Sequence, residues 1–379
     1  MAHARLDTLT IRDFRNIAHA ELAPAADGIV VVGENGQGKT NLIEAIAYLR
    51  LMRSLRGARD RDLPRFGAPA FHVAAECTGT RARRMSAAVD KSGRKKVTLD
   101  GVEPERLTEA LDALPSVSFS PRDVDLVVGA PAERRRYLDI TLALSSAPYL
   151  HALRLYRGAL ARRNAALRDA ARAGRGDRRG AAASAGSVAA WEPALAEHGA
   201  VLVRARRAWV AERAAGFRAQ CATIGERAVA SLGYASSLAD ADDPRAALGA
   251  QLARQREHDL RRGLTHAGPH RDDLLLTLDG HDLRGVGSAG QQRTAAIVLR
   301  MLEADTHREA TGITPLLLLD DPFAELDRRR TSRILGLLDA AGMGQSVLCV
   351  PREDEIPPQF TRLERWRVID GAFTRERSS

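Results

Sequence analysis

A glycine-rich segment separates two apolar stretches near the start of the chain, in the sequence GIVVVGENGQGKTNLIEAIAYL at residues 28–49. The apolar run before it predicts a short buried strand, and the apolar residues after Thr40 recur at helical spacing. Glycine tolerates positive φ and lets the backbone approach a ligand closely. A strand, a glycine-rich loop and a helix in this order therefore predict a concave array of N–H donors that favours an anion.

The spacing of Gly33, Gly38, Lys39 and Thr40 fits the P-loop pattern. In that pattern the backbone amides surround the phosphates of a nucleotide, the lysine reaches the β- and γ-phosphate oxygens, and the hydroxyl is a ligand of Mg²⁺. Only four of the 57 basic residues are lysines, so an arginine-rich chain has kept a compact ammonium at this point. The residues predicted to bind the nucleotide here are Gly33, Asn35, Gly36, Gln37, Gly38, Lys39, Thr40 and Asn41.

The second half of such a site is predicted by PLLLLDDPFAELD at residues 315–327, an apolar strand that ends in two carboxylates. Asp320 would hold Mg²⁺ together with Thr40, and Asp321 would orient or deprotonate the attacking water, so Asp321 and Lys39 are the predicted catalytic residues. Two adjacent acids at the end of a buried strand are costly unless a cation or hydrogen bonds compensate them. The alternative is a strand followed by an Asp-Pro turn, and the P-loop weakens it.

GSAGQQRT at residues 287–294 predicts the start of a helix, with Ser288 placed as its N-cap and Gly290 leaving the first amides open. A second phosphate-binding helix end in one chain is useful if it faces the γ-phosphate bound by another subunit. Ser288, Gly290 and Gln291 are the residues predicted for that contact. A capped helix without a ligand is the alternative.

The composition favours a globular protein with a polyanionic partner. The 379 residues are enough for two or three domains, and 45% of them are hydrophobic. The 57 basic residues exceed the 48 acidic ones, which favours nucleic acid as a partner. A GC-rich codon bias would explain the choice of arginine over lysine better than it explains this excess. Because aromatic residues make up only 4%, base-stacking surfaces are scarce and duplex DNA is the better prediction.

No stretch of about 18 apolar residues occurs, and the first residues lack the layout of a signal peptide. We therefore expect a cytoplasmic protein, close to the nucleoid if DNA is the partner, with no membrane contact. The three cysteines are far apart and predict neither a disulfide framework nor a CxxC metal site.

The order of predicted strands and helices along the chain predicts an α/β fold with an insertion. Residues 1–120 alternate short strands with helices at 40–52 and 104–114, and residues 263–379 again mix predicted strands and helices. Between them, residues 121–262 are rich in alanine and arginine at helical spacing and predict an all-α lobe. Its middle, residues 172–187, predicts an exposed loop between two long antiparallel helices that form a short hairpin.

Several polar residues leave their roles open. His266 and His270 lie four apart as zinc ligands on a helix would, but Gly268 and Pro269 between them disfavour a helix and therefore a metal site. Residues 271–273, Arg-Asp-Asp, fit either the nucleotide site or the start of a strand. The three arginines at 134–136 fit either a DNA contact or a solvated helix face.

The order of GENGQGKT, an inserted helical segment, SAGQQRT and LLLLDDPFAELD resembles the ABC-type heads of SMC-like proteins, and in detail the RecF family of bacterial recombination mediators. Further stretches typical of that family are LTIRDFRNI, SLRGARDRDL, FSPRDVDLVVGAPAERRRYLD and HAGPHRDDL. The resemblance extends from about residue 5 to 350. It implies a P-loop ATPase head assembled from both chain ends.

The resemblance also implies how the site works. In RecF-like proteins ATP lies between two heads, each of which contributes its signature helix to the other, so ATP with Mg²⁺ and an ATP-dependent homodimer are expected. The dimer binds double-stranded DNA near single-stranded gaps and acts with RecR and RecO to load RecA. By motif, Asp321 takes the position of the usual catalytic glutamate and Asp327 the loop that links the two sites.

Three departures from the ABC pattern predict slow ATP hydrolysis, and the resemblance implies that this hydrolysis is DNA-stimulated and regulatory. The signature begins Ser-Ala-Gly, SVLCVPRED has no switch histidine, and residues 118–124 contain no Q-loop glutamine. Two alternative functions are an ATPase subunit of a membrane transporter and a mechanical SMC-like clamp. The basic charge and the long insertion disfavour the first, and the insertion of roughly 150 residues is too short for the coiled coil of the second.

Overall fold

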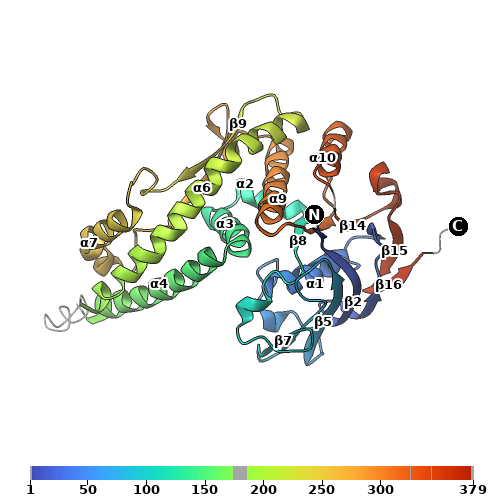
Figure 1. Ribbon diagram of the computed structural model, residues 1–379, viewed down its shortest axis with the longest axis horizontal. Helices are drawn as coiled ribbons and strands as arrows, with labels where there is room; N and C mark the ends of the chain where they lie inside the picture. The colour runs from blue at the N-terminus through green and yellow to red at the C-terminus, as the bar shows by residue number, and fades with distance from the viewer. Residues whose placement is uncertain (1, 174–185, 325, 343, 377–379) are drawn as a thin grey trace. The chain divides into compact units, whose positions relative to one another are not determined.

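The computed structural model describes residues 2–173, 186–324, 326–342 and 344–376. The chain divides into two compact units (Figure 1). Met1–Asp123 and Ala296–Ser379 form the first, which we call the head, and Val124–Ala295 form the second, which we call the lobe. The two ends of the chain therefore form one compact unit, as the sequence predicted.

The head contains two sheets and a helix packed against strands of both. The six-stranded sheet has the order β16-β15-β4-β14-β13-β8, and β16 alone runs antiparallel to its neighbour. Its strands are β4 (Gly28–Val32), β8 (Ser116–Phe119), β13 (Leu316–Asp320), β14 (Ser346–Val350), β15 (Glu364–Ile369) and β16 (Ala372–Arg375). Strands β4, β13 and β14 are buried along their whole length, which explains why they read as unbroken apolar runs.

The five-stranded sheet is antiparallel throughout, with the order β3-β2-β5-β6-β7. Its strands are β2 (Arg5–Phe14), β3 (Ile17–Leu22), β5 (Ala70–Thr78), β6 (Arg84–Asp90) and β7 (Lys95–Leu99). Buried and exposed residues alternate along them, as in a sheet with one solvated face. Helix α1 (Lys39–Leu51) contributes to the same apolar core as both sheets.

Further elements also belong to the head. A two-stranded sheet joins β1 (Ala2–His3) and β12 (Ile313–Thr314), and helix α10 (Arg328–Ala340) follows β13. The helix predicted over 104–114 is wrong, because only a 3-10 turn forms at Leu107–Ala110. Asp112 adopts a left-handed backbone with φ 59°, and its carboxylate accepts from Arg50 at 3.1 Å and meets His307 Nε2 at 2.6 Å. These tertiary contacts override the local helical pattern.

The lobe is mainly helical. Its helices are α2 (Asp125–Val128), α3 (Pro131–Ser145), α4 (Ala147–Ala173), α6 (Glu192–Ile224), α7 (Pro244–Arg262), α8 (Leu283–Val286) and the first turns of α9 (Ala289–Thr311). Helices α4 and α6 run antiparallel, since Arg163 bonds Glu192 near the start of α6 whereas Tyr149 bonds Arg206 farther along it. The loop predicted at 172–187 lies mostly outside the described residues.

The sequence predicted an all-α lobe, but the lobe also contains a three-stranded sheet. Strand β9 (Ala230–Ala235) pairs antiparallel with β10 (Asp273–Leu278), which pairs with β11 (His281–Asp282). This pairing draws the β10–β11 hairpin into the lobe. The boundary between the units lies at Ala295 and Ala296 rather than at 262 and 263 for that reason.

Buried ion pairs hold the helices of the lobe together. Arg163 on α4 is fully buried and donates to Asp259 on α7 at 2.7 Å and to Glu192 on α6 at 3.0 Å. Arg206 on α6 is nearly as buried and donates to Asp139 on α3 at 2.7 Å. Each arginine satisfies acids from other helices, so each fixes how those helices meet.

Replacing Arg163 by methionine leaves Asp259 buried without its arginine partner. Removing one partner of a buried ion pair costs about 3 to 5 kcal/mol. We expect a loss of that size in the free energy of unfolding, measured by urea denaturation followed by far-UV circular dichroism. The control is Arg154→Met at an exposed position of the same helix, which should change stability by less than about 0.5 kcal/mol. Equal effects of the two substitutions would contradict this account.

His270 makes the stability of the lobe depend on pH. Its Nδ1 meets the Tyr156 hydroxyl at 2.6 Å and its Nε2 meets the Thr265 carbonyl at 3.1 Å. Burial lowers the pKa of His270 to about 4. Between that value and the ordinary pKa of about 6.5 the unfolded chain binds the extra proton, so stability falls as the pH falls through this window.

In the His270→Gln variant the amide keeps a donor and an acceptor but does not titrate. We expect the wild type to lose about 1 to 3 kcal/mol more stability than the variant between pH 7 and pH 5. Urea denaturation at the two pH values measures this difference, because the other titrating groups are common to both proteins. Parallel pH profiles would show that His270 has no such role.

Candidate functional site

The P-loop and the acidic strand end meet at one edge of the six-stranded sheet. Strand β14 pairs in parallel with β4 on one side and with β13 on the other. The carboxyl ends of these strands therefore share an edge, which is where parallel sheets place their ligand sites. Gly33 follows β4 and Asp320 ends β13, so segments almost 300 positions apart in the sequence become neighbours.

The backbone of the P-loop requires glycine at two kinds of position. Gly36 and Gly38 have φ of 85° and 124°, in the region that other residues rarely adopt. A Cβ atom on Gly33 would lie 2.6 Å from both the Val368 carbonyl oxygen and its Cγ1, so this glycine allows β15 to pack against the loop. Gly38 is the N-cap of α1 and provides no capping side chain, and the first turn of the helix has no acid. The start of α1 therefore keeps its amides and its positive dipole end for an anion.

Lys39 lies at the base of the loop. Its side chain is 7% exposed, and its Nζ donates to the carbonyl oxygens of Gly33 and, at 2.9 Å, of Glu34. The ammonium is thus held within the loop whose amides would surround a phosphate.

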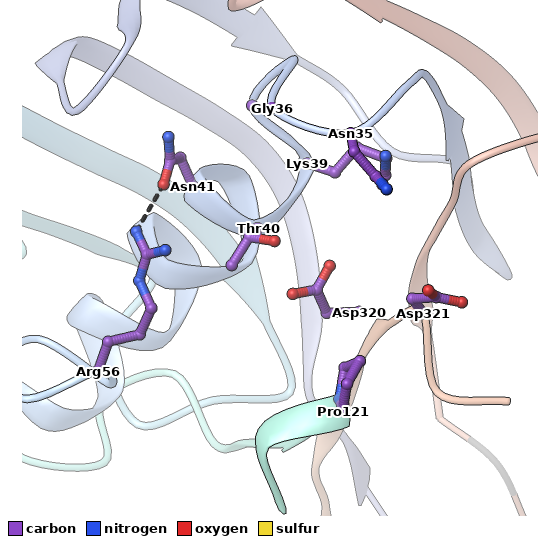
Figure 2. Close-up of a pocket in the computed structure, with 10 residues that line it drawn as sticks. Asn35, Gly36, Lys39, Thr40, Asn41, Arg56, Pro121, Asp320 and Asp321 are labelled. Carbon is purple, nitrogen blue, oxygen red and sulfur yellow. Dashed lines mark hydrogen bonds between the residues drawn. The ribbon is translucent and has the colours of Figure 1, made fainter. Parts of the chain in front are cut away.

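Thr40 and Asp320 face each other across this edge (Figure 2). Burial raises the pKa of Asp320 and the neighbouring Asp321 raises it further, whereas a hydrogen bond with Thr40 lowers it. Both groups provide oxygen atoms, the ligands that Mg²⁺ prefers. A buried carboxylate next to a hydroxyl fits a divalent cation, which would relieve the cost of burying the charge.

Asp321 takes the first position after the strand. Its backbone has φ 45°, a left-handed conformation that aspartate tolerates better than most residues. Its N–H donates to the Cys349 carbonyl at 2.9 Å, which attaches the turn to β14. The side chain lines the same cavity as Asp320.

These groups surround a cavity of about 370 Å³ in the head, a volume in the usual range for small-molecule sites. Its lining residues are Asn35, Gly36, Gly38, Lys39, Thr40, Asn41, Arg56, Pro121, Asp320 and Asp321. Gly33 and Gln37 support the loop from outside this lining. The Gln37 side chain accepts from the Asp370 N–H at 2.6 Å, and its carbonyl accepts from Gly371 at 2.8 Å.

The sequence reasoning did not identify Arg56 and Pro121. Arg56 donates to Asn41 Oδ1 at 2.7 Å (Figure 2) and to Glu44 at 2.8 Å. Glu44 is buried and also accepts from Arg15 at 3.0 Å. Arg56 stands in the family-typical stretch SLRGARDRDL, which was a usable signal, but nothing in that string distinguishes it from the other arginines.

The signature residues lie in the lobe and do not line this cavity. Ser288 and Gln291 form a reciprocal capping box: the Ser288 N–H donates to Gln291 Oε1 at 2.9 Å, and the Gln291 N–H donates to Ser288 Oγ at 3.3 Å. The predicted N-cap is thus confirmed. Gln291 Nε2 also donates to Glu226 at 3.1 Å, and Gly290 lies within the first turn of α9. The γ-phosphate contact of these residues stays a prediction.

The residues whose roles the sequence left open belong to the lobe. Arg134 is buried and donates to Asp273 at 2.7 Å, so it is neither a DNA contact nor part of a solvated face. His266 Nδ1 meets Asp259 at 2.7 Å, and residues 271–273 do not line the head cavity. Within the described residues, no group of three or more histidine, cysteine, aspartate or glutamate side chains could hold a metal ion. Nor does any described helix have the length and apolarity that crossing a membrane requires.

Known proteins resemble this chain over most of its length. The family model of the RecF/RecN/SMC N terminal domain matches residues 5–363. The DNA replication and repair protein RecF of Anaeromyxobacter dehalogenans (strain 2CP-C) is 40% identical over 346 residues, which cover 89% of this chain and 90% of that protein. The RecF of Roseiflexus castenholzii is 36% identical over 389 residues, covering 96% and 98%.

Solved structures agree with this similarity. The structure of the recombination mediator protein RecF with ATP in the RecFOR pathway has 26% identity and a TM-score of 0.87, covering 99% of this chain and 98% of that one. The Smc head domain of Pyrococcus furiosus, at 18% identity and a TM-score of 0.55 over 98% and 95%, shares the fold alone. The chain belongs to the RecF family of DNA replication and repair proteins, with an SMC-like ABC-type ATPase head.

Proposed function

We propose that the protein is a recombination mediator that binds ATP and Mg²⁺ in the head cavity, dimerises on ATP and binds duplex DNA near single-stranded gaps. There it would act with RecR and RecO to promote RecA loading. The observation that carries this proposal is the cavity that joins the P-loop to the Asp320–Asp321 turn. The ATP-bound relative of the RecFOR pathway supports the choice of nucleotide.

Different residues of the cavity would bind the phosphates and the Mg²⁺ ion. The N-terminal amides of α1 would receive the phosphates, and Lys39 would leave its carbonyl partners for the β- and γ-phosphate oxygens. Thr40 and Asp320 would hold Mg²⁺, which neutralises charge on the phosphate oxygens. Arg56 is fixed beside Asn41 at the wall of the cavity and adds a positive charge there.

Hydrolysis in this proposal depends on Asp321 and on a second copy of the chain. Asp321 would orient the attacking water or accept its proton. Ser288, Gly290 and Gln291 would contact the γ-phosphate held by the other copy, which is consistent with their absence from the lining of the head cavity. ATP binding would in this way promote dimerisation, and hydrolysis would reverse it.

The net charge of +9 supports a polyanionic partner. Phosphate contacts by arginine fit duplex DNA better than base stacking does, since only 4% of the residues are aromatic. Binding to DNA should therefore weaken steeply as the salt concentration rises.

Lys39→Met removes the ammonium and keeps an apolar stem of similar length. We expect ATP to tighten binding of the wild type to a labelled duplex with a single-stranded gap, and to have no effect on the variant. Fluorescence anisotropy without nucleotide, with ADP and with ATP measures this effect, and light scattering should detect a dimer only when ATP and Lys39 are both present. Lys91→Met, at an exposed position of the same head, is the matched control and should behave as the wild type. DNA binding that ignores ATP in the wild type would contradict the proposal.

Asp321→Asn keeps the shape of the side chain and removes its basicity. We expect the wild type to turn over less than about one ATP per second, at the low end of ordinary enzymes. The variant should lose about 100-fold or more of that rate, within the usual contribution of a general base. A steady-state phosphate-release assay measures both rates, and ATP-dependent dimerisation of the variant shows that binding survives. A variant that hydrolyses ATP at the wild-type rate would remove Asp321 from the mechanism.

A further inference from the structure

A second cavity, of about 600 Å³, lies within the lobe. One side of it is a face of α7 that carries Gln251, Arg254 and Gln255. Their spacing of three and four residues places them on the same side of the helix. Four residues of a neighbouring segment also line this cavity and do not line the head cavity: His266, Ala267, Arg271 and Asp272.

Two arginines at this cavity have no carboxylate partner among the residues that the structure describes. Arg254 is exposed and makes no ion pair with any residue that the structure describes. Arg271 donates to the Thr265 carbonyl at 3.1 Å, and within the described ranges it too lacks an ion pair. Other arginines of the lobe differ in this respect, since Arg163 and Arg134 pair with acids at 2.7 Å. The cavity therefore presents two guanidinium groups to an anionic group from outside the chain.

The one acid of the cavity wall does not cancel this charge. Asp272 is buried, accepts from the Tyr234 hydroxyl, and lies 4.0 Å from Nη1 of the buried Arg206. Its carboxylate is thus compensated within the lobe. Burial also raises the pKa of Asp272 and so disfavours its charged form.

The helix face supplies amide groups as well. Gln255 Oε1 is buried and accepts no hydrogen bond from the residues that the structure describes. Gln251 differs, because it exchanges hydrogen bonds with Ser237, to the carbonyl at 3.3 Å and from the hydroxyl at 3.1 Å. A glutamine oxygen that lacks a donor can accept from a peptide N–H.

The charges near the cavity also disfavour nucleic acid. Asp240, Asp242 and Asp243 are exposed in the loop that continues from Ser237, and Glu257 is exposed on α7. A nucleic acid brings a phosphate with every nucleotide and would meet these carboxylates. A peptide can bring one acid to the two arginines and keep neutral residues elsewhere.

We propose that the lobe cavity binds a short acidic peptide segment of a partner protein, with a carboxylate between Arg254 and Arg271 and a backbone N–H at Gln255. The site is separate from the nucleotide cavity, which lies in the head. It does not require ATP, so it can be tested independently of the proposed function.

The test uses the full chain without nucleotide and two short fluorescein-labelled peptides, one alternating glutamate with glycine and the other glutamine with glycine. We expect the glutamate peptide to bind about tenfold or more tightly than the glutamine peptide by anisotropy, as charge-assisted pairing with two arginines predicts. Arg254→Gln should remove most of this preference. Arg261→Gln, an exposed arginine of α7 that does not line the cavity, is the matched control and should keep it.

Arg271→Gln should act as Arg254→Gln does, but Arg271 also bonds the backbone at Thr265, so Arg254→Gln decides the outcome. Because Arg254 is exposed, its substitution should not unfold the protein, and an unchanged circular dichroism spectrum checks this. Equal binding of the two peptides, or equal effects of Arg254→Gln and Arg261→Gln, would overturn the proposal. So would a short labelled oligonucleotide that binds more tightly than the glutamate peptide and loses its affinity in Arg254→Gln.

Discussion

The burial of helix α1 is the constraint on which the head depends. The helix packs between the two sheets, so its polar groups must find partners inside the protein. Glu44 is the clearest case, because its carboxylate is almost fully buried and accepts from Arg15, Ser54 and Arg56. These hydrogen bonds outweigh the effect of burial and keep the pKa of Glu44 below its ordinary value. The buried helix thus carries a charge, and that charge fixes the segments on either side of it.

The same arrangement holds the residues around the head cavity in place through hydrogen bonds. Arg56 reaches the wall of the cavity because Glu44 holds its guanidinium at 2.8 Å. Asn16 accepts from Asn41 at 2.8 Å and donates to the Gln37 carbonyl at 3.2 Å, so strand β2 and β3 are connected to the P-loop through the turn between them. The turn between β15 and β16 holds Gln37 from another direction. A binding loop supported in this way needs little reorganisation when a ligand arrives.

The sequence predicted local features well and long-range pairing poorly. The P-loop and the strand before Asp320 were predictable because glycine spacing and apolar runs are local signals. Ser288 was identified as an N-cap from the sequence, but its reciprocal hydrogen bonds with Gln291 were not predicted. Strand β9 was missed because its partner β10 lies some 40 positions away, and only that pairing makes its sequence a strand. Arg56 was missed for the same reason, because its role comes from Glu44 and not from its own surroundings in the sequence.

The pairing of arginines refines what the net charge means. Many arginines of this chain act inside the protein, as Arg50 does with Glu303 at 2.8 Å and Arg163 with Asp259 at 2.7 Å. Each such pair cancels one positive and one negative charge, so it adds nothing to the excess of 57 over 48. The surplus of +9 therefore belongs to the residues outside these pairs, most of which are exposed because an unpaired buried charge is costly. The basic character is thus a property of the surface, where it can act on a polyanion, even though many of the arginines serve the fold.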